Sequence, residues 1–452
     1  GAYPSAVWWV GVASLVGWPF AALAGAPLAL DAIAKLGLRH FARLIIRYGT
    51  ILIVPTAALD SYFYGRPVAS PINMLRYNLN LKGGAQLYGT EPASFYVKNL
   101  LLNFGLALPA AIAAVPVLLL LAATKSGRSA GPASKADTAR PSRDPPGVAE
   151  IADSALGPLN TLLVLSPLYL WVVFFSAIPH KEERFLYPIY PLVALAAAIA
   201  IDGTAELVCA CFPVDANRRP PRVLRRALHA ARAIILVAAV ALGLSRSAAL
   251  CVYYGAPAHV YTRLSRELSR DGFASPGATP INLCVGREWY RFPSSFFLPS
   301  PSISLRFVRS GFGGLLPSPF SAPAPTGSRA IHPHFNDRNA EEESAYTPLA
   351  ECDFLVELLL AEGIGERVMA PYRSNHGSSQ QPLQSPLVPI GSTQWSQWGG
   401  GVEFLDASRS PSWSRAFFVP SLWEWSESRP QATPFLRKQN VFGEYAIMRR
   451  TR

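Results

Sequence analysis

The sequence predicts an α-helical polytopic membrane protein of about six spans followed by a small α/β domain. Half of its 452 residues are hydrophobic and only 15% are charged, whereas soluble domains carry about 25% charge. Long apolar runs fill residues 1–254, while 255–452 holds short strand-like runs separated by Pro, Ser and Gly. These observations exclude a small soluble domain, a disordered chain and a disulfide-dense secreted scaffold. They predict two domains, 1–254 and 255–452.

Six apolar runs approach the length of about 20 residues that a helix needs to cross a membrane. Three of them carry no charge over their whole length, and a fourth is uncharged but short. The other two contain Arg47 and Arg246, which are tolerated if the guanidinium reaches the interface or faces the bundle interior. For the short run and the two runs that contain an arginine, a buried core helix is the alternative to a membrane span. The six runs are 6–30, 44–59, 99–123, 155–178, 185–201 and 233–254.

Basic residues gather in alternate connectors, 31–43, 124–154 and 202–232. The positive-inside rule places these three connectors in the cytosol. The opposite, lumenal side then receives the connector 60–98, the short turn 180–184 and the whole C-terminal domain.

The net charge of +12 suggests nucleic acid as a first partner. A nucleic-acid reader concentrates Lys and Arg on a soluble face with stacking aromatics, however, and here they lie in short connectors between apolar runs. Nucleic acid is therefore excluded, and a lipid bilayer is the predicted partner. The sequence indicates no particular protein partner.

Motifs of the common soluble enzymes are absent from the sequence. There is no Walker loop, no G-x-S-x-G elbow and no H-E-x-x-H helix, and no cysteine spacing fits a metal site. Cys284 and Cys352 both fall in strand-like segments of the predicted lumenal domain. They pair if the compartment is oxidising, and two buried free thiols are the alternative.

The most informative segment is the turn after Pro179, which places His180, Lys181, Glu182, Glu183 and Arg184 between two apolar runs. One interpretation is a solvated turn that separates two helices. The other is an electrostatic clamp, in which the three basic residues bind an anionic headgroup and the two carboxylates orient them. A lipid-phosphate leaving group needs such stabilisation as its charge develops.

The connector 60–98 combines aromatic residues with carboxylates and amides. Asp60, Arg66, Tyr88 and Glu91 are its candidate site residues, because sugar sites stack apolar sugar faces on aromatic rings and bind hydroxyls with polar groups. An aromatic belt at the membrane interface is the alternative.

Three strings resemble the dolichyl-phosphate-mannose-dependent mannosyltransferases of the GT-C superfamily, glycosyltransferase family 22. The strings are HKEERFLYPIYPL (180–192), LDSYFYGRPVASPINMLRYNL (59–79) and LYGTEPASFYVKNLLLNFG (87–105). The resemblance favours the clamp over the solvated turn and implies a GT-C-like bundle.

Three strings in the tail resemble the α-1,2 branch of that family, which acts in asparagine-linked glycan precursor assembly. They are INLCVGREWYRFPSSFFLP (281–299), FNDRNAEE (335–342) and FLDASRS (404–410). The resemblance covers nearly the whole chain, apart from 124–154 and 370–400.

The resemblance implies a reaction on the lumenal side of the endoplasmic reticulum membrane. Mannose passes from dolichyl phosphate mannose to the dolichyl-diphosphate oligosaccharide as its seventh and ninth mannoses, with inversion at the anomeric carbon and with no cofactor or metal. His180, Lys181 and Arg184 are implied to bind the donor phosphate, with Glu182 and Glu183 as supporting residues.

The catalytic residue of this family is an acidic side chain in the first lumenal loop, and no residue of this sequence matches it. We expect that loop to precede Gly1, so the catalytic base is unknown in this sequence. A glycosylphosphatidylinositol mannosyltransferase with the same donor is one alternative function. A lipid or sugar transporter is another, although no internal symmetry of the kind common in transporters is visible. Arg246 is either an interfacial anchor or a second phosphate contact.

Overall fold

The computed structural model describes most of the chain. The described residues are 2–79, 87, 89–129, 157–212, 221–275, 277, 279–291, 295–309, 314–318, 320–323, 325–359, 394–412, 414–418 and 440–451, without the side chains of 125–129, 157–159 and 287.

The chain divides into two compact units. The first contains residues 1–243 together with 320–331, and the second contains 244–319 together with 332–452. The division falls inside one long helix, α10 (Arg222–Tyr254), so this helix belongs to both units.

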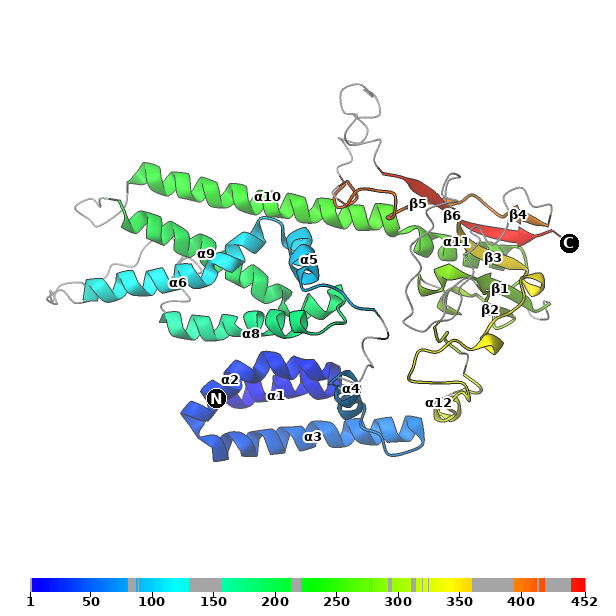
Figure 1. The fold of residues 1–452 in the computed structure, drawn as a ribbon, viewed down its shortest axis with the longest axis horizontal. Helices are drawn as coiled ribbons and strands as arrows, with labels where there is room; N and C mark the ends of the chain where they lie inside the picture. The colour runs from blue at the N-terminus through cyan, green and yellow to red at the C-terminus, as the bar shows by residue number, and fades with distance from the viewer. Residues whose placement is uncertain are drawn as a thin grey trace, which may run out of the picture. The chain divides into compact units, whose positions relative to one another are not determined.

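The first unit is helical, and Figure 1 shows its helices as long rods. Within the described residues, six segments are long and apolar enough to cross a membrane, which confirms the predicted fold class for this part of the chain. The candidate spans are Pro19–Leu36, Leu38–Tyr64, Ala107–Thr124, Asn160–Ala177, Glu183–Ala210 and Arg222–Tyr254. The spans lie in α2 (Ala22–Leu36), α3 (Leu38–Tyr64), α6 (Ala107–Ser129), α8 (Gly157–Ala177), α9 (Tyr190–Ala210) and α10. The unit also contains the shorter helices α1 (Ala2–Val12), α4 (Ser70–Leu79) and α5 (Ser94–Phe104).

The predicted single crossing over 6–30 is wrong. The structure folds this run into a hairpin of α1 and α2, in which the Tyr3 hydroxyl donates a hydrogen bond to Asp31. The turn follows from Trp18 and Pro19: the residue before a proline is pushed out of the helical region, and Trp18 is extended with φ −118° and ψ 119°. Gly25 lets the two helices meet, since a Cβ there would lie 2.7 Å from a methyl carbon of Val10.

The predicted connector over 31–43 is almost entirely helical. Helix α2 continues to Leu36 and α3 begins at Leu38, so Gly37 alone forms the joint, with φ at +80°. Lysine and arginine are good helix formers, and therefore the basic residues of this segment extend the helix ends instead of breaking them.

Helices α6 and α9 pack closely along their length. A Cβ at Gly203 of α9 would lie 2.6 Å from Val117 and 2.9 Å from Leu121, both on α6. The buried face of α9 is otherwise mainly alanine, including Ala196 and Ala200. Small residues of this kind let two membrane helices approach until their backbones nearly touch.

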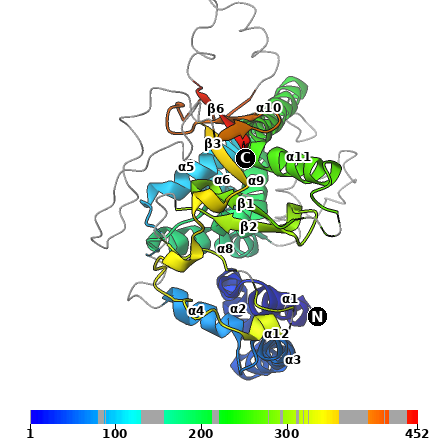
Figure 2. The same cartoon turned by 90° about the vertical axis from the view of Figure 1, so that its right-hand side faces the viewer.

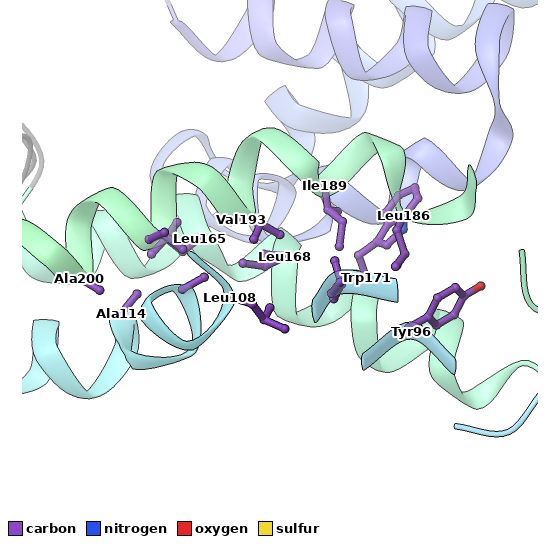
Figure 3. Packing of buried hydrophobic residues seen from close by; sticks show 14 of the residues in the cluster. Tyr96, Leu108, Ala114, Leu165, Leu168, Trp171, Leu186, Ile189, Val193 and Ala200 are labelled. Atoms are coloured by element: carbon purple, nitrogen blue, oxygen red, sulfur yellow. The ribbon is translucent and has the colours of Figure 1, made fainter. Parts of the chain in front are cut away.

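One continuous core joins α5, α6, α8 and α9. Figure 3 shows Trp171 and Leu165 of α8 facing Ile189 and Val193, with Tyr96 of α5 at one end of the cluster. Trp171, Tyr96 and Leu165 are fully buried. This core lies directly beneath the charged turn between α8 and α9.

The second unit contains a mixed sheet in the order β2-β1-β3-β6-β4, and β5 also pairs with β6. Strands β1, β2 and β3 are parallel, while β4, β5 and β6 run antiparallel to their neighbours. This confirms the predicted α/β domain. The strands are β1 (Ile281–Val285), β2 (Ile303–Phe307), β3 (Phe354–Leu359), β4 (Trp395–Gln397), β5 (Val402–Leu405) and β6 (Phe442–Arg450).

Helix α11 (Ala256–Arg270) covers one face of this sheet, as Figure 2 shows. Leu283 of β1 and Val356 of β3 point to the α11 side, where they pack with Leu264. Their neighbours Cys284 and Leu355 belong to a separate cluster with Trp395. The alternation follows from the two-residue period of a strand, which sends successive side chains to opposite faces.

Candidate functional site

The charged turn after α8 packs against the loop that precedes α5. The amide of Glu91 donates a hydrogen bond to the carbonyl oxygen of Pro179 at 3.0 Å. Glu182 has extended backbone geometry, and a 3-10 helix, η4 (Glu183–Ile189), begins immediately after it and continues into α9. The turn is therefore held at both ends by helices and on one side by the loop.

Lys181 ties the two segments together. Its side chain is only 6% exposed, and Nζ donates hydrogen bonds to the carbonyl oxygens of Glu91, at 3.0 Å, and Ile178, at 2.5 Å. These contacts favour a positioning role for Lys181 over the predicted direct contact with a phosphate. No carboxylate contacts the ammonium group within the described residues, so its charge still adds positive potential to the turn.

His180, Glu182 and Arg184 form a chain of polar contacts on the outer side of the turn. Nδ1 of His180 lies 2.9 Å from the carbonyl oxygen of Gly89, and Nε2 lies 3.1 Å from Oε1 of Glu182. Arg184 donates from Nη2 to the same Oε1 at 2.9 Å, and its Nε contacts Oε2 of Glu182. The Arg184 side chain is 69% exposed, so its guanidinium is oriented by Glu182 and still open to a ligand.

The carboxyl of Glu182 is held in its charged form. Partial burial acts to raise its pKa, but the hydrogen bonds from Arg184 and His180 outweigh burial and bring the pKa below its usual 4.5. At neutral pH Glu182 is therefore an anion that orients Arg184.

Glu183 points the other way, toward α5 and α9. Asn103 on α5 donates from Nδ2 both to Oε1 of Glu183, at 2.7 Å, and to the hydroxyl of Tyr190, at 2.8 Å. Glu183 therefore fixes the first turn of η4 to the bundle. The predicted support was an orientation of the basic residues, and no contact of Glu183 with them is found within the described residues, so that role stays a prediction.

Aromatic rings support the turn from below. Trp171 donates from its indole nitrogen to the carbonyl oxygen of Phe185 at 2.7 Å. Trp18, from the hairpin of α1 and α2, lies 5.6 Å from Trp171 and 5.4 Å from both Phe175 and Phe185, measured between ring centroids. Trp171 and Phe175 are buried and the other two rings are partly buried, so the aromatic cluster stabilises one position of the turn.

Of the four residues predicted in the connector 60–98, Glu91 meets the turn through its backbone. Asp60 instead accepts a hydrogen bond at 2.8 Å from the amide of Ser70, the first residue of α4. Arg66 is exposed, and Tyr88 lies outside the described residues. No contact joins the Asp60 or Arg66 side chain to the turn within the described part of the chain.

Arg246 of α10 contacts the second unit's own loop. Its Nη1 donates to the carbonyl oxygen of Ala416 at 3.2 Å, and the neighbouring Ser245 hydroxyl donates to that of Phe418 at 2.8 Å. These contacts hold Arg246 against a loop of its own unit, and its two predicted roles, an interfacial anchor and a phosphate contact, stay predictions.

Cys284 and Cys352 form a disulfide, with their Cα atoms 5.8 Å apart. The bond connects β1 to the residue that shortly precedes β3. Within the described residues no three His, Cys, Asp or Glu side chains gather as a metal site. That no metal or cofactor takes part stays a prediction.

Sequence reasoning missed Asn103, Trp18 and the carbonyl oxygen of Gly89. Asn103 and Gly89 both lie in the string 87–105, but nothing in the spacing of that string distinguishes them from their neighbours. In the predicted single crossing over 6–30, Trp18 is one apolar residue among many. Only the Trp-Pro pair, as a helix-breaking signal, could have placed it at a turn.

The known proteins named below that this chain resembles are all mannosyltransferases. The sequence model of the Alg9-like mannosyltransferase family matches residues 1–299. The chain is 33% identical over 423 residues to alpha-1,2-mannosyltransferase ALG9 of Mus musculus, covering 93% of this chain and 61% of that protein. It is also 33% identical over 403 residues to alpha-1,2-mannosyltransferase ALG9 of Arabidopsis thaliana, covering 89% of this chain and 57% of that protein.

A more distant match is GPI mannosyltransferase 3 of Yarrowia lipolytica, which is 29% identical over 156 residues, or 34% of this chain and 22% of that protein. No solved structure matches the chain significantly. The chain spans about three fifths of the length of the curated ALG9 relatives named above. Since the family model covers well over half of the sequence, the chain belongs to the Alg9-like mannosyltransferase family.

Proposed function

We propose that this chain is part of an α-1,2-mannosyltransferase of asparagine-linked glycan assembly in the endoplasmic reticulum membrane. The donor is dolichyl phosphate mannose, and the acceptor is the dolichyl-diphosphate oligosaccharide, which receives its seventh and ninth mannoses. Family membership and the match to ALG9 proteins over most of the chain support this proposal. The six candidate spans fit a multi-pass protein whose two substrates are both lipid-linked.

The observation that carries the proposal is the Arg184 guanidinium, oriented by Glu182 and open on its other side. During transfer the bond between the mannose C1 and the phosphate oxygen breaks, and negative charge grows on the dolichyl phosphate. A cation placed in advance at that position lowers the energy of the transition state, because it needs no reorganisation as the charge develops.

In this proposal His180 supports Arg184 through their shared partner Glu182. Lys181 positions the turn and adds positive potential from its buried ammonium group. The direct phosphate contact therefore falls to Arg184, with His180 beside it.

The acceptor O2 attacks C1 from the face opposite the leaving phosphate, so the β-linked donor gives an α-linked product. The proton of the acceptor hydroxyl passes to a general base. The family resemblance places that base in the first lumenal loop, and none of the described residues is assigned to it. The proposal also places the turn and the C-terminal unit on the lumenal side, following the positive-inside rule.

The glycosylphosphatidylinositol alternative uses the same donor and differs in its acceptor. It is less favoured, because the match to the GPI mannosyltransferase covers about a third of the chain. Family membership also disfavours a transporter.

Complementation tests the proposal. The chain, extended by the segment expected ahead of Gly1, is expressed in cells that lack the α-1,2 enzyme, and the lipid-linked oligosaccharides are profiled. We expect the six-mannose species to be replaced by the nine-mannose species. Persistence of the six-mannose species despite good membrane expression would show that the acceptor assignment is wrong.

The clamp is tested in the same cells. Arg184→Ala removes an exposed side chain, so we expect normal expression and a fall in transfer of roughly 10²- to 10³-fold. Arg39→Ala removes another exposed arginine, from the start of α3, and serves as the matched control, with transfer unchanged. Equal activity of the two variants would rule out Arg184 as the phosphate ligand.

A further inference from the structure

A hollow of about 360 Å³ lies in the second unit and takes no part in the function proposed above. Its walls are Tyr254, at the end of α10, Pro257, near the start of α11, and Tyr290 with Arg291. Tyr290 ends a 3-10 helix that follows β1, so a single short segment supplies two of the four lining residues.

Arg291 is held in one orientation. Its Nε lies 2.8 Å from Oε2 of Glu288, a carboxylate that is only 4% exposed. Its guanidinium carbon lies 4.5 Å from the ring centroid of Phe404 and 5.0 Å from that of Tyr290. No hydrogen-bond partner of the two Nη atoms is found in the described part of the chain, so these atoms can donate to a ligand.

Tyr290 and Tyr254 supply aromatic surface. Tyr290 is 61% exposed while its ring packs against the Arg291 guanidinium. Tyr254 is fixed by an edge contact with Phe404, with the ring centroids 5.5 Å apart. An exposed, oriented ring beside free N–H donors is the arrangement that binds a sugar, whose C–H face stacks on the ring while its hydroxyls accept hydrogen bonds.

The charge of the site distinguishes a neutral ligand from an anionic one. Glu288 neutralises Arg291 within the protein, so the pair offers directed donors with little net positive charge. Among the four lining residues Arg291 is the one cation, and it is paired, whereas the charged turn adds the Lys181 ammonium to the paired Arg184. The hollow therefore suits a neutral polyol better than a phosphate, which gains most from charge-assisted hydrogen bonds.

A second hollow of the same unit, of about 400 Å³, provides a contrast. It also pairs an arginine with a tyrosine, Arg309 and Tyr346, whose ring centroid lies 5.5 Å from the guanidinium carbon. There Nη2 of Arg309 donates to Glu343 at 2.8 Å and lies 3.7 Å from Glu341. The Nη atoms of Arg291 are open to a ligand in the first hollow, whereas Nη2 of Arg309 is already bonded to Glu343 in the second. The second hollow is therefore the weaker candidate for a sugar site.

We propose that the hollow lined by Tyr254, Pro257, Tyr290 and Arg291 binds one neutral hexose ring of a mannose-containing glycan. Tyr290 stacks on the sugar face, and the Nη atoms of Arg291 donate to its hydroxyls. That the glycan is the lipid-linked acceptor rests on the proposed function. The position of Tyr254 supports this, because it ends a candidate membrane span and a lipid-anchored glycan begins at the membrane surface.

The test uses the full chain, purified in a detergent that contains no sugar, and α-1,2-linked mannobiose as the probe. Binding is followed by saturation-transfer NMR and titrated to a dissociation constant. We expect Tyr290→Ala to raise the dissociation constant roughly 2- to 12-fold, which corresponds to one lost aromatic contact. We expect Arg291→Lys, which keeps a cation beside Glu288 but removes the Nη fork, to raise it by a similar factor.

Phe296→Ala is the matched control, because this ring is 86% exposed on the same unit and does not line the hollow. We expect it to bind mannobiose as the unchanged protein does. Lack of binding by the unchanged protein, or equal affinity of Tyr290→Ala and Phe296→Ala, overturns the proposal. Displacement of the probe by inorganic phosphate would show an anion site and overturns it as well.

The clamp variant separates this proposal from the proposed function. Arg184→Ala is expected to lose transfer and keep mannobiose affinity. If Arg184→Ala loses transfer but Tyr290→Ala binds normally, the proposed function stands and the sugar site fails. If mannobiose binding depends on Tyr290 while complementation fails, the sugar site stands without the proposed acceptor.

Discussion

On α10 the side chains of Leu236 and Val237 are 65% and 67% exposed, whereas on β3 those of Leu355 and Val356 are fully buried. All four are ordinary apolar residues in regular secondary structure. The strand is covered by other parts of its own unit, while the helix presents its apolar surface outward. The comparison shows that apolar content alone does not determine burial. A membrane helix leaves its apolar surface to lipid, and a strand of the second unit must find protein partners.

The two regions also differ in where they place charge. In the first unit a run of five ionisable residues is concentrated in one turn and is held there by backbone carbonyls and an amide side chain. In the second unit the buried Glu288 has its own arginine. Both arginines are paired with a carboxylate and keep open donors, but the turn adds a further cation, Lys181, which no carboxylate contacts within the described residues.

The largest expected difference is in the free energy of unfolding, when one apolar side chain is truncated in each of the two regions. Phe354→Ala removes a ring that is 2% exposed and packs 4.9 Å from Trp398, so we expect a loss of about 3–5 kcal/mol in the free energy of unfolding. Leu236→Ala, on the exposed face of α10, is expected to change it by less than about 0.5 kcal/mol. Denaturant unfolding in detergent, followed by near-UV circular dichroism, measures both. Similar losses for the two variants would contradict the comparison.

The disulfide sharpens the comparison, because it stabilises the second unit alone. Cys352→Ala opens a link between residues 68 positions apart, and we expect it to cost about 2–4 kcal/mol. Cys251→Ala, which removes an exposed free thiol, is the control and should have no effect. Thermal unfolding without reductant measures both. An unchanged midpoint for Cys352→Ala would show that the sheet does not depend on the link.

A smaller effect is expected at the polar support of the charged turn. Asn103→Leu removes the donor shared by Glu183 and Tyr190, and the loss of these two hydrogen bonds should cost about 1–3 kcal/mol. Asn99→Leu on the same helix removes only a local bond to the carbonyl oxygen of Phe95, so a smaller loss is expected. Thermal unfolding in detergent ranks the two variants. A larger loss of stability for Asn99→Leu than for Asn103→Leu would mean that Glu183 does not hold the turn to α5.

The smallest expected effect is a pH dependence that arises from Glu182. Because its pKa in the folded protein is below the usual 4.5, its ion pair contributes stability above that value and loses it as the pH falls through the lowered pKa. The difference in unfolding temperature between Glu182→Gln and the unchanged protein should therefore shrink as the pH falls from about 5 to about 3. Parallel curves of unfolding temperature against pH for the two proteins would contradict the pairing with Arg184 and His180.

Much of the fold was predictable where local pattern decides it. The sequence predicts short strands within 255–452, and three of its apolar runs, 281–285, 303–308 and 354–360, match β1, β2 and β3 almost residue for residue. Apolar runs bounded by turn residues have few alternatives to a buried strand. The short strands β4 and β5 were not predicted. They are formed by pairing with β6, and a sequence does not show its partner strand.

The candidate site was predictable in composition and not in geometry. The run His180–Arg184 stood out because ionisable residues are rare between two apolar segments. The structure gives these residues different roles: Arg184 is the open group, Glu182 orients it, and Lys181 is a buried positioning residue. These roles depend on contacts with Gly89, Glu91 and Asn103, which lie far away in the chain.

The sequence by itself determined that this protein has several membrane-crossing helices, a C-terminal sheet domain and one charged turn between two spans. These properties follow from hydrophobic length, strand pattern and residue type, all of which are local. Only the tertiary structure decided that 6–30 folds back on itself, that Lys181 is buried between two carbonyls, and that Tyr290 and Arg291 share a hollow with Tyr254. Each of these depends on contacts between distant segments, where packing and the need to satisfy buried polar groups outweigh local preference.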